Sequence, residues 1–338
     1  MARSLAMLQL APDQILPESL CGGVVAIGNF DGMHRGHQQL LATAKAAAER
    51  LGKSFGLLTF EPHPRSFFQP PEPVFRLTPP PLKALLAKIL GAGFVATVNF
   101  DAVTASQSPE EFITQQLVKR LGVAHVITGF DFHFGKGRKG TSETLVAAGK
   151  SLGFGVTVVE QVADEGEGTM APFSSSAIRS SLRRGHVREA AKGLGYQWVV
   201  MGEVVPGDQR GRTIGFPTAN IILEPGAEPY RGIYAVTVRE KKGGPLWQGA
   251  AYFGDRPTFN TNRTFLEVYL LDQDIDLYGK TLVVNFVDLV RGDKTFSSVA
   301  DLVDQMKEDC GAVRKILLAD KPMDFPLAKA QAQGLIAV

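Results

Sequence analysis

The pattern of hydrophobic runs changes near residue 186, and this change constrains the fold more than any other feature of the sequence. Before it, short apolar runs at 24–27 and 94–100 alternate with helix-like stretches at 37–51 and 109–121. Strands separated by helices predict a parallel sheet with helical crossovers. After it, β-branched and aromatic runs follow one another with only turns between them, which is typical of an antiparallel barrel.

The remaining expected elements complete an α/β domain that is followed by a β-barrel domain. In the α/β part, further strands are expected at 54–60, 125–128 and 154–159, and further helices at 84–90 and 145–152. In the barrel part, strands are expected at 198–205, 232–239, 248–253, 265–271 and 281–289, with a closing helix at 298–318. We expect a first domain at 1–186 and a second at 187–320, and we assign no role to the tail at 321–338.

Composition narrows the class of protein. The chain has 338 residues, of which 44% are hydrophobic and 21% charged, and this suits two globular domains. The net charge of +2 does not favour a nucleic-acid-binding protein, which would carry a basic stripe. Cys21 and Cys310 are far apart, and the sequence shows neither a convincing signal peptide nor a run of roughly 18 apolar residues. We therefore expect a cytoplasmic protein without a nucleic-acid or membrane partner.

A glycine-rich turn with two histidines follows the first buried run. It occupies residues 28–37, between the strand expected at 24–27 and the next helix. Glycines let the backbone approach a ligand, and a helix start offers unpaired N–H donors to phosphate. His34 and His37 can add donors that stabilise charge during attack on an α-phosphate. An ordinary loop is the alternative, and a zinc site is disfavoured because only two histidines and no cysteine are near.

Three further polar segments, at 59–65, 129–140 and 174–179, follow expected strands or begin an expected helix. The serines from Ser174 can cap that helix in any case. They can also direct hydroxyl and amide groups at the β- and γ-phosphates, with Arg179 adding positive charge. In an open parallel sheet, ligands bind at the carboxyl ends of the strands, and this placement favours a ligand site.

Together these segments resemble the adenylyltransferase module of the bifunctional riboflavin kinase/FAD synthetase family. That module is a Rossmann-like domain with a HIGH-type motif, here matched by the H-x-G-H spacing at 34–37, and it transfers AMP from ATP to FMN. The resemblance implies ATP contacts from two segments, namely from Gly28, Asn29, Phe30, His34, His37, Ser174, Ser175 and Arg179. It also implies that His63, Arg65 and Asp131 lie near the flavin side, where Asp131 would help to hold metal or ribose.

A second constellation lies in the barrel half. Gly207, Gly211 and Gly215 allow backbone amides to wrap phosphates, although no Walker loop is present. In an extended strand Thr218 and Asn220 face the same way, and both are oxygen donors suited to Mg²⁺. Alternation places Glu267 opposite the apolar row of its strand. A lone glutamate there is usually solvated, and it acts as a general base only if it reaches a substrate hydroxyl.

The barrel half resembles the riboflavin kinase module, a six-stranded antiparallel barrel with a C-terminal helix. The segments that carry the resemblance occur in one order, at 217–220, 232–235, 256–259, 266–268 and 276–279. The resemblance implies that Glu267 is the base that takes the proton from the ribityl hydroxyl of riboflavin. It implies that Thr218 and Asn220 are metal and nucleotide ligands, that Gly207, Gly211 and Gly215 contact ATP, and that Arg291 lies near the flavin.

The resemblance extends from about residue 15 to 320, with a few departures. Tyr252 and Phe253 stand before Gly254, where the family usually has asparagine. Ser176 replaces a common threonine and retains its hydroxyl, Ala177 replaces a longer side chain, and Met33 replaces an aliphatic residue.

The expected function is ATP-dependent phosphorylation of riboflavin to FMN, followed by adenylylation of FMN to FAD with loss of pyrophosphate. ATP is a co-substrate and Mg²⁺ the expected metal. The alternatives are a related adenylyltransferase with another acceptor, a kinase with a degenerate first domain, and a flavin-binding protein without activity. The paired motifs, with His34, His37, Arg179 and Glu267 all present, favour the bifunctional enzyme.

Overall fold

The computed structural model describes residues 7–69, 74–161, 173–207, 210–223, 225–254, 264–321 and 323–335. The chain divides into two compact units. Unit 1 comprises residues 1–74 and 83–173, and unit 2 comprises residues 75–82 and 174–338. The domain boundary expected at 186 stays a prediction. The segment at 256–259, which the sequence analysis uses for the kinase resemblance, lies outside the described residues.

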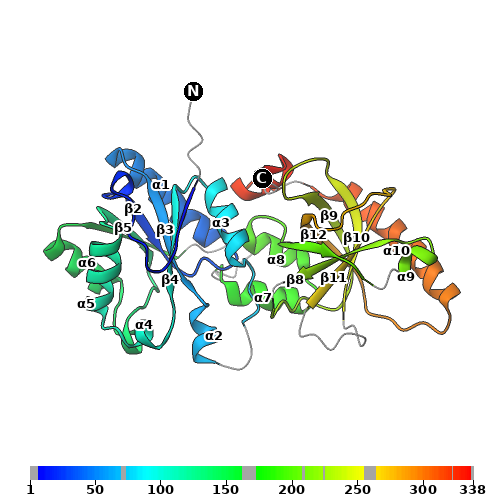
Figure 1. The fold of residues 1–338 in the computed structure, drawn as a ribbon, viewed down its shortest axis with the longest axis horizontal. Helices are drawn as coiled ribbons and strands as arrows, with labels where there is room; N and C mark the ends of the chain where they lie inside the picture. The colour runs from blue at the N-terminus through cyan, green and yellow to red at the C-terminus, as the bar shows by residue number, and fades with distance from the viewer. Residues whose placement is uncertain are drawn as a thin grey trace. The chain divides into compact units, whose positions relative to one another are not determined.

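Unit 1 is built on a six-stranded sheet in the order β1-β4-β3-β2-β5-β6, and every neighbouring pair is parallel (Figure 1). Its strands are β1 (Leu8–Leu10), β2 (Val24–Ile27), β3 (Phe55–Glu61), β4 (Phe94–Asn99), β5 (His125–Gly129) and β6 (Gly155–Val159). All four residues of β2 are buried, as a continuous apolar run in a parallel sheet requires. The predicted parallel sheet is therefore confirmed.

The helices of unit 1 connect these strands. They are α1 (Arg35–Leu51), α2 (Pro64–Phe68), α3 (Pro80–Ile89, in unit 1 from residue 83), α4 (Ala102–Ser106), α5 (Pro109–Phe112) and α6 (Ser142–Leu152). α1 packs against β2, β3 and β5, and it ends at Gly52, whose φ of 62° only glycine adopts at little cost. The helix expected at 109–121 is present, but from Ile113 to Arg120 it is wound as a π-helix.

The order of strands places the start of α1 at a special point of the sheet. β3 lies on one side of β2 and β5 on the other, so the direction in which the chain adds strands reverses at β2. In open α/β sheets the ligand lies at such a reversal, beyond the carboxyl ends of the strands. The loop between β2 and α1 and the residues after β5 both lie at this edge.

Unit 2 is built on a closed barrel in the order β10-β11-β8-β7-β12-β9, antiparallel throughout. Its strands are β7 (Val199–Val205), β8 (Thr218–Leu223), β9 (Gly232–Glu240), β10 (Trp247–Phe253), β11 (Thr264–Leu270) and β12 (Thr281–Gly292). Fully buried side chains pair across neighbouring strands, as Ile221 does with Leu266 and Ala251 with Val268. These rows fill the barrel, and the predicted six-stranded antiparallel barrel is confirmed.

Five helices of unit 2 lie in the described residues: α7 (Ser175–Arg183), α8 (Val187–Leu194), α9 (Arg210–Thr213), α10 (Val299–Ala319) and α11 (Pro326–Ala332). The long helix α10 packs along β9, β10 and β12, as its place beside the barrel in Figure 1 shows. It is the expected closing helix. α8 packs on α7 and on β12.

The tail, to which the sequence analysis assigns no role, docks on the barrel. Leu327 of α11 is fully buried. The side chain of Gln331 accepts a hydrogen bond from the backbone N–H of Gln197 at 3.2 Å and donates one to its carbonyl at 2.9 Å. A side-chain amide thus pairs with the peptide group just before β7 as a neighbouring strand would.

Residues 75–82 belong to unit 2 although the chain on both sides of them belongs to unit 1. Phe75 and Leu77 are buried, and the Phe75 ring meets the indole of Trp198 edge to face at 5.6 Å. The indole N–H of Trp198 donates to the Leu77 carbonyl, and the Arg179 guanidinium donates to the Phe75 carbonyl. This proline-rich segment is therefore an ordered part of unit 2.

Candidate active sites

The loop between β2 and α1 has an uncommon backbone conformation. Phe30 and Met33 have φ values of 48° and 42°. A non-glycine residue in this region costs on the order of 1–3 kcal/mol, and it persists only where its surroundings fix it. Both side chains are fully buried and anchor the loop, while Asn29 stays exposed. Gly28 continues the β2 ladder by donating from its N–H to the Leu58 carbonyl.

The two predicted catalytic histidines of this loop lie together. His34 is the N-cap residue of α1, and its ring stacks on the ring of His37 with centroids 3.7 Å apart. Burial lowers the pKa of His37 well below its ordinary value, and the nearby His34 and Lys83 lower it further. His37 is therefore neutral at pH 7 in the free protein.

The environment of His37 also favours one tautomer. Its Nδ1 is buried and has no hydrogen-bond partner among the residues described. An unsatisfied buried N–H is more costly than an unsatisfied nitrogen lone pair. We therefore place the ring proton of neutral His37 on Nε2 and leave Nδ1 with its lone pair. Nε2 is then the atom with which His37 can donate to a ligand.

A buried lysine, Lys83, contacts the strand next to this loop, and no sequence pattern singles it out. The ammonium group of Lys83 donates to Thr59 Oγ1 at 3.0 Å and to Glu61 Oε1 at 3.1 Å. Thr59 Oγ1 in turn donates to the backbone carbonyl of Asn29 at 3.2 Å. Lys83 stands near the start of an apolar helix, and no local pattern in the sequence indicates this contact.

The residues predicted to lie near the flavin occupy two strand ends. His63 follows β3 and caps α2, accepting from the Arg65 N–H at 3.1 Å, and it is buried. Arg65 is exposed on α2, and Asp131 is exposed two residues after β5. In the strand order β3-β2-β5, these two ends flank the end of β2. Their contacts to flavin stay predictions.

The segment predicted to hold the triphosphate lies in unit 2. Ser174 caps α7 by accepting from the Ala177 N–H at 3.2 Å, so its expected capping role is confirmed. Ser175 is the first residue of that helix. Arg179 is buried and donates to the Phe75 carbonyl. The roles of Ser174, Ser175 and Arg179 toward ATP stay predictions.

On the barrel, the register of two strands brings the predicted kinase residues together. Glu267 of β11 lies directly across from Asn220 of β8, and Tyr269 lies across from Thr218. Opposite residues in an antiparallel pair have Cβ atoms roughly 4.5–5.5 Å apart and share a face. Glu267, Asn220 and Thr218 therefore share the face opposite the buried row of Leu266 and Val268.

Two of the three predicted glycines of the loop before β8 lie where a side chain would not fit. A side chain at Gly207 would collide with the amide of Asn220, and one at Gly211 would collide with the Phe216 carbonyl. Gly215 has a φ of 86° and forms the turn that leads into β8. The structure thus gives each glycine a steric reason, and their contact with ATP stays a prediction.

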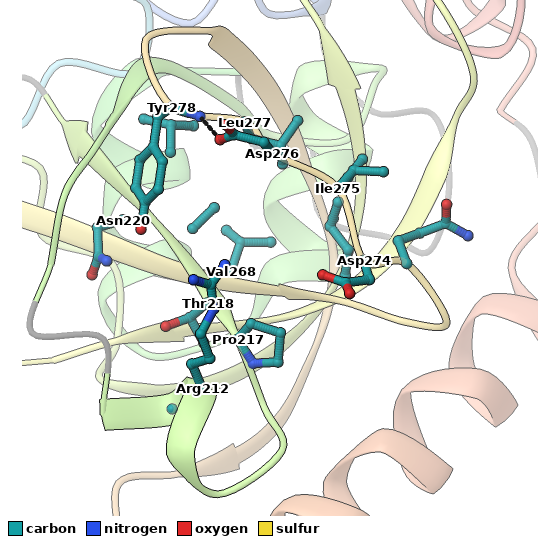
Figure 2. Close-up of a pocket in the computed structure, with 15 residues that line it drawn as sticks. Arg212, Pro217, Thr218, Asn220, Val268, Asp274, Ile275, Asp276, Leu277 and Tyr278 are labelled. Atoms are coloured by element: carbon teal, nitrogen blue, oxygen red, sulfur yellow. Dashed lines mark hydrogen bonds between the residues drawn. The ribbon is translucent and has the colours of Figure 1, made fainter.

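A pocket opens at the end of the barrel beside Thr218 (Figure 2). Val268, Leu270 and Leu277 contribute apolar surface, and the polar lining comes from Arg212, Thr218, Asn220, Gln273, Asp274, Asp276 and Tyr278. In Figure 2 the ring of Tyr278 lies on the same side as Asn220, and Asp274 and Ile275 lie on the other. The segment at 276–279 carries part of the kinase resemblance, but no sequence pattern indicates a role for Tyr278 or Arg212.

Arg291, predicted to lie near the flavin, is engaged by a helix. Its guanidinium forms a two-pronged ion pair with Asp309 of α10, at 2.9 and 2.8 Å. Asp309 is 6% exposed and Arg291 22%. The pair joins β12 to α10, and the flavin contact of Arg291 stays a prediction.

Among the residues that the structure describes, neither site gathers a cluster of His, Cys, Asp or Glu side chains. In the described ranges, no three His, Cys, Asp or Glu residues lie close enough together to hold a metal ion. Thr218 and Asn220 instead offer two neutral oxygen donors, which suits an ion that keeps water and phosphate oxygens in its shell.

The fold and the sites define a class: a transferase with a Rossmann-like nucleotidyltransferase module and a flavokinase barrel. Residues 16–173 match the family FAD synthetase, and residues 194–317 match the family riboflavin kinase. The chain belongs to the bifunctional riboflavin kinase/FMN adenylyltransferase family.

Similar proteins span nearly the whole chain. The bifunctional riboflavin kinase/FMN adenylyltransferase of Bacillus subtilis is 36% identical over 88% of this chain and 93% of its own length. The enzyme of the same name from Escherichia coli K12 is also 36% identical, over 89% of this chain and 95% of its own. A crystal structure from Streptococcus pneumoniae, described as a macrolide-efflux protein, superposes with a TM-score of 0.78 at 31% identity and covers 91% of this chain and 99% of its own. Within the described part of the present chain, no helix has the length and apolar character needed to cross a membrane.

Proposed function

We propose that the chain carries out its two reactions at two separate sites, with riboflavin phosphorylated on the barrel and FMN adenylylated at the loop between β2 and α1. As a member of this family, the chain is a bifunctional transferase that makes FMN from riboflavin and FAD from FMN, using ATP. The assignment of each reaction to named residues is the proposal.

The kinase assignment is supported by the spatial order of the polar side chains, from the pocket toward Glu267. Thr218 and Asn220 line the pocket, and Glu267 lies directly across the ladder from Asn220. A nucleotide whose base occupies the pocket can pass its phosphates over Thr218 and Asn220 and bring the γ-phosphate toward Glu267. Glu267 then accepts the proton of the ribityl hydroxyl, the hydroxyl oxygen bonds to the γ-phosphorus, and ADP leaves. This pairing of Glu267 with Asn220 beside a pocket is the observation that carries the proposal.

The magnesium ion belongs to the proposal as well. Thr218 and Asn220 would hold it through their side-chain oxygens. When bound, the ion supplies positive charge that offsets the charge of the phosphates.

The adenylylation assignment is supported by the loop between β2 and α1. The start of α1 offers backbone donors and the positive end of the helix dipole to an anion. His34 and His37 are stacked there, and His37 is neutral with its donor on Nε2. A phosphate oxygen of FMN attacks the α-phosphorus of ATP and pyrophosphate leaves, while these donors stabilise the charge that develops. In this proposal Ser174, Ser175 and Arg179 hold the triphosphate, and His63, Arg65 and Asp131 face the flavin.

The test is a product assay of the purified protein with ATP and Mg²⁺, started once from riboflavin and once from FMN. From riboflavin we expect FMN and ADP first, then FAD and pyrophosphate. From FMN we expect FAD and pyrophosphate without a lag. A protein that binds flavin but forms neither product from either substrate contradicts the proposal.

A further inference from the structure

Lys83 is an ionisable side chain beside the adenylylation loop that no reaction step above uses. Its side chain is only 4% exposed, and the carboxylate with which it pairs, on Glu61, is 18% exposed. Removing an ammonium group from water is costly, even when it is paired. An apolar residue at this position of α3 would avoid that cost. Packing alone therefore does not account for a lysine here.

The hydrogen-bond directions around Thr59 are fixed by the chemistry of the partners. An ammonium group can only donate, so Thr59 Oγ1 accepts from Lys83. The single hydroxyl hydrogen of Thr59 is then free to point at the Asn29 carbonyl, 3.2 Å away. The charge on Lys83 polarises the hydroxyl and strengthens this second bond. A chain of two bonds thus runs from α3 through β3 to the loop after β2.

These two hydrogen bonds determine the orientation of one peptide group. The peptide bond between Asn29 and Phe30 is planar, and its C=O and N–H point in opposite directions when it is trans. With the Asn29 carbonyl held toward Thr59, the Phe30 N–H points in the opposite direction, away from Thr59. Phe30 has a φ of 48°, a conformation that persists only where the surroundings impose it.

We propose that Lys83 is a positioning residue for adenylyl transfer, which acts through Thr59 to hold the Asn29–Phe30 peptide in the orientation that receives the phosphates of ATP. The inference rests on the proposed role of this loop. The Lys83 ammonium donates to Thr59 and Glu61, and its link to the loop runs through the Thr59 hydroxyl. Its influence therefore reaches ATP through the backbone of the loop.

Three variants separate this role from simple packing. Lys83→Met removes the charge, Thr59→Val removes only the hydroxyl, and Thr59→Ser keeps the hydroxyl. Lys88→Met makes the same change as Lys83→Met at an exposed position of the same helix. The riboflavin kinase activity of each protein, measured in the same preparation, reports whether unit 2 is intact.

The measurement is the KM for ATP and the kcat of FAD formation from FMN. We expect Lys83→Met and Thr59→Val each to raise the KM for ATP by about tenfold to a hundredfold, as for the loss of a charge-assisted hydrogen bond. Thr59→Ser and Lys88→Met should stay within about twofold of the wild type. The double variant should lose no more than the worse single variant, because both changes break one chain.

Two results would overturn the inference. One is an unchanged KM for ATP in Thr59→Val, with kcat alone reduced, since partial unfolding lowers the amount of active enzyme without changing its affinity. The other is an equal loss in Thr59→Ser and Thr59→Val, which would assign the effect to the methyl group. A wild-type protein that forms no FAD from FMN would instead refute the proposed function, so the two failures are distinguishable. Should Lys83→Met not fold, Thr59→Val and Thr59→Ser still decide the question.

Discussion

The two sites differ in how their residues are brought together. On the barrel, Thr218, Asn220 and Glu267 stand on two neighbouring strands, and regular alternation and register alone place them on one face. At the loop between β2 and α1, the geometry depends on two buried residues with left-handed backbone and on contacts from α3 and β3. A site on paired strands is set by periodicity, whereas a site on a loop is set by tertiary contacts that periodicity does not encode.

The largest expected effect concerns Glu267. It tests whether the side chains that strand register places on one face of the barrel act together in the kinase reaction. Replacing Glu267 with Gln keeps the shape of the side chain and removes its basicity. We expect FMN formation from riboflavin to fall by about 10² to 10⁴, the usual contribution of a general base. The rate is measured by chromatography of FMN, and the conversion of added FMN to FAD serves as the control because the other site is unchanged. Kinase activity within a few-fold of the wild type would mean that Glu267 is not the base.

The second effect concerns the loop site. His37→Ala removes one donor toward the developing charge, and we expect FAD formation from FMN to fall by about 10² to 10³. FMN formation from riboflavin in the same protein should be unaffected. An equal loss of both activities would indicate unfolding rather than a lost donor, and it would weaken the contrast between the sites.

The third effect distinguishes a structural from a substrate-binding role for Arg291. Breaking its two-pronged pair with Asp309 should cost about 2 kcal/mol of the free energy of unfolding, because the aspartate is largely buried. We expect Arg291→Met and Asp309→Asn to destabilise unit 2 by similar amounts in urea. If Arg291 also contacts flavin, Arg291→Met alone will raise the KM for riboflavin.

The smallest effect is a pH dependence of stability from His37. Its pKa is lowered in the folded protein, chiefly by burial. Below the ordinary histidine pKa of about 6.5, the unfolded chain therefore binds a proton that the folded chain does not, and stability falls as the pH falls. We expect the thermal midpoint of the wild type to drop more steeply than that of His37→Asn between about pH 7 and pH 5. Parallel curves for the two proteins would mean that His37 is not held neutral.

The sequence predicts most of the architecture because hydrophobic periodicity carries it. The strand at 24–27 and those expected on β9, β10 and β12 are found within a few residues of their predicted bounds. Sequence patterns do not predict several of the shorter elements, among them β1, β8, α2, α4, α8, α9 and α11, and for two of these the reason is plain. β1 has only three residues, and β8 begins inside a segment whose Pro, Thr and Asn obscure its apolar alternation.

The candidate sites likewise have features that short sequence patterns predict and features that they do not. Alternation is enough to place Asn220 and Thr218 on one face, and the motif at 28–37 is enough to place His34 and His37 at a helix start. The contact of Lys83 with Thr59 joins side chains 24 residues apart, which only the tertiary fold brings together. Sequence patterns of short range do not contain this information.

The membership of residues 75–82 in unit 2 bears on how this protein can be divided for experiments. A barrel fragment that begins at residue 174 would lack the Leu77 carbonyl that accepts from the Trp198 indole and the Phe75 carbonyl that accepts from Arg179. It would also expose the surface of Trp198 that Phe75 covers. Cutting the gene between its two family matches therefore produces an incomplete piece, and a peptide spanning 75–82, supplied separately, is the missing part that should restore its melting temperature.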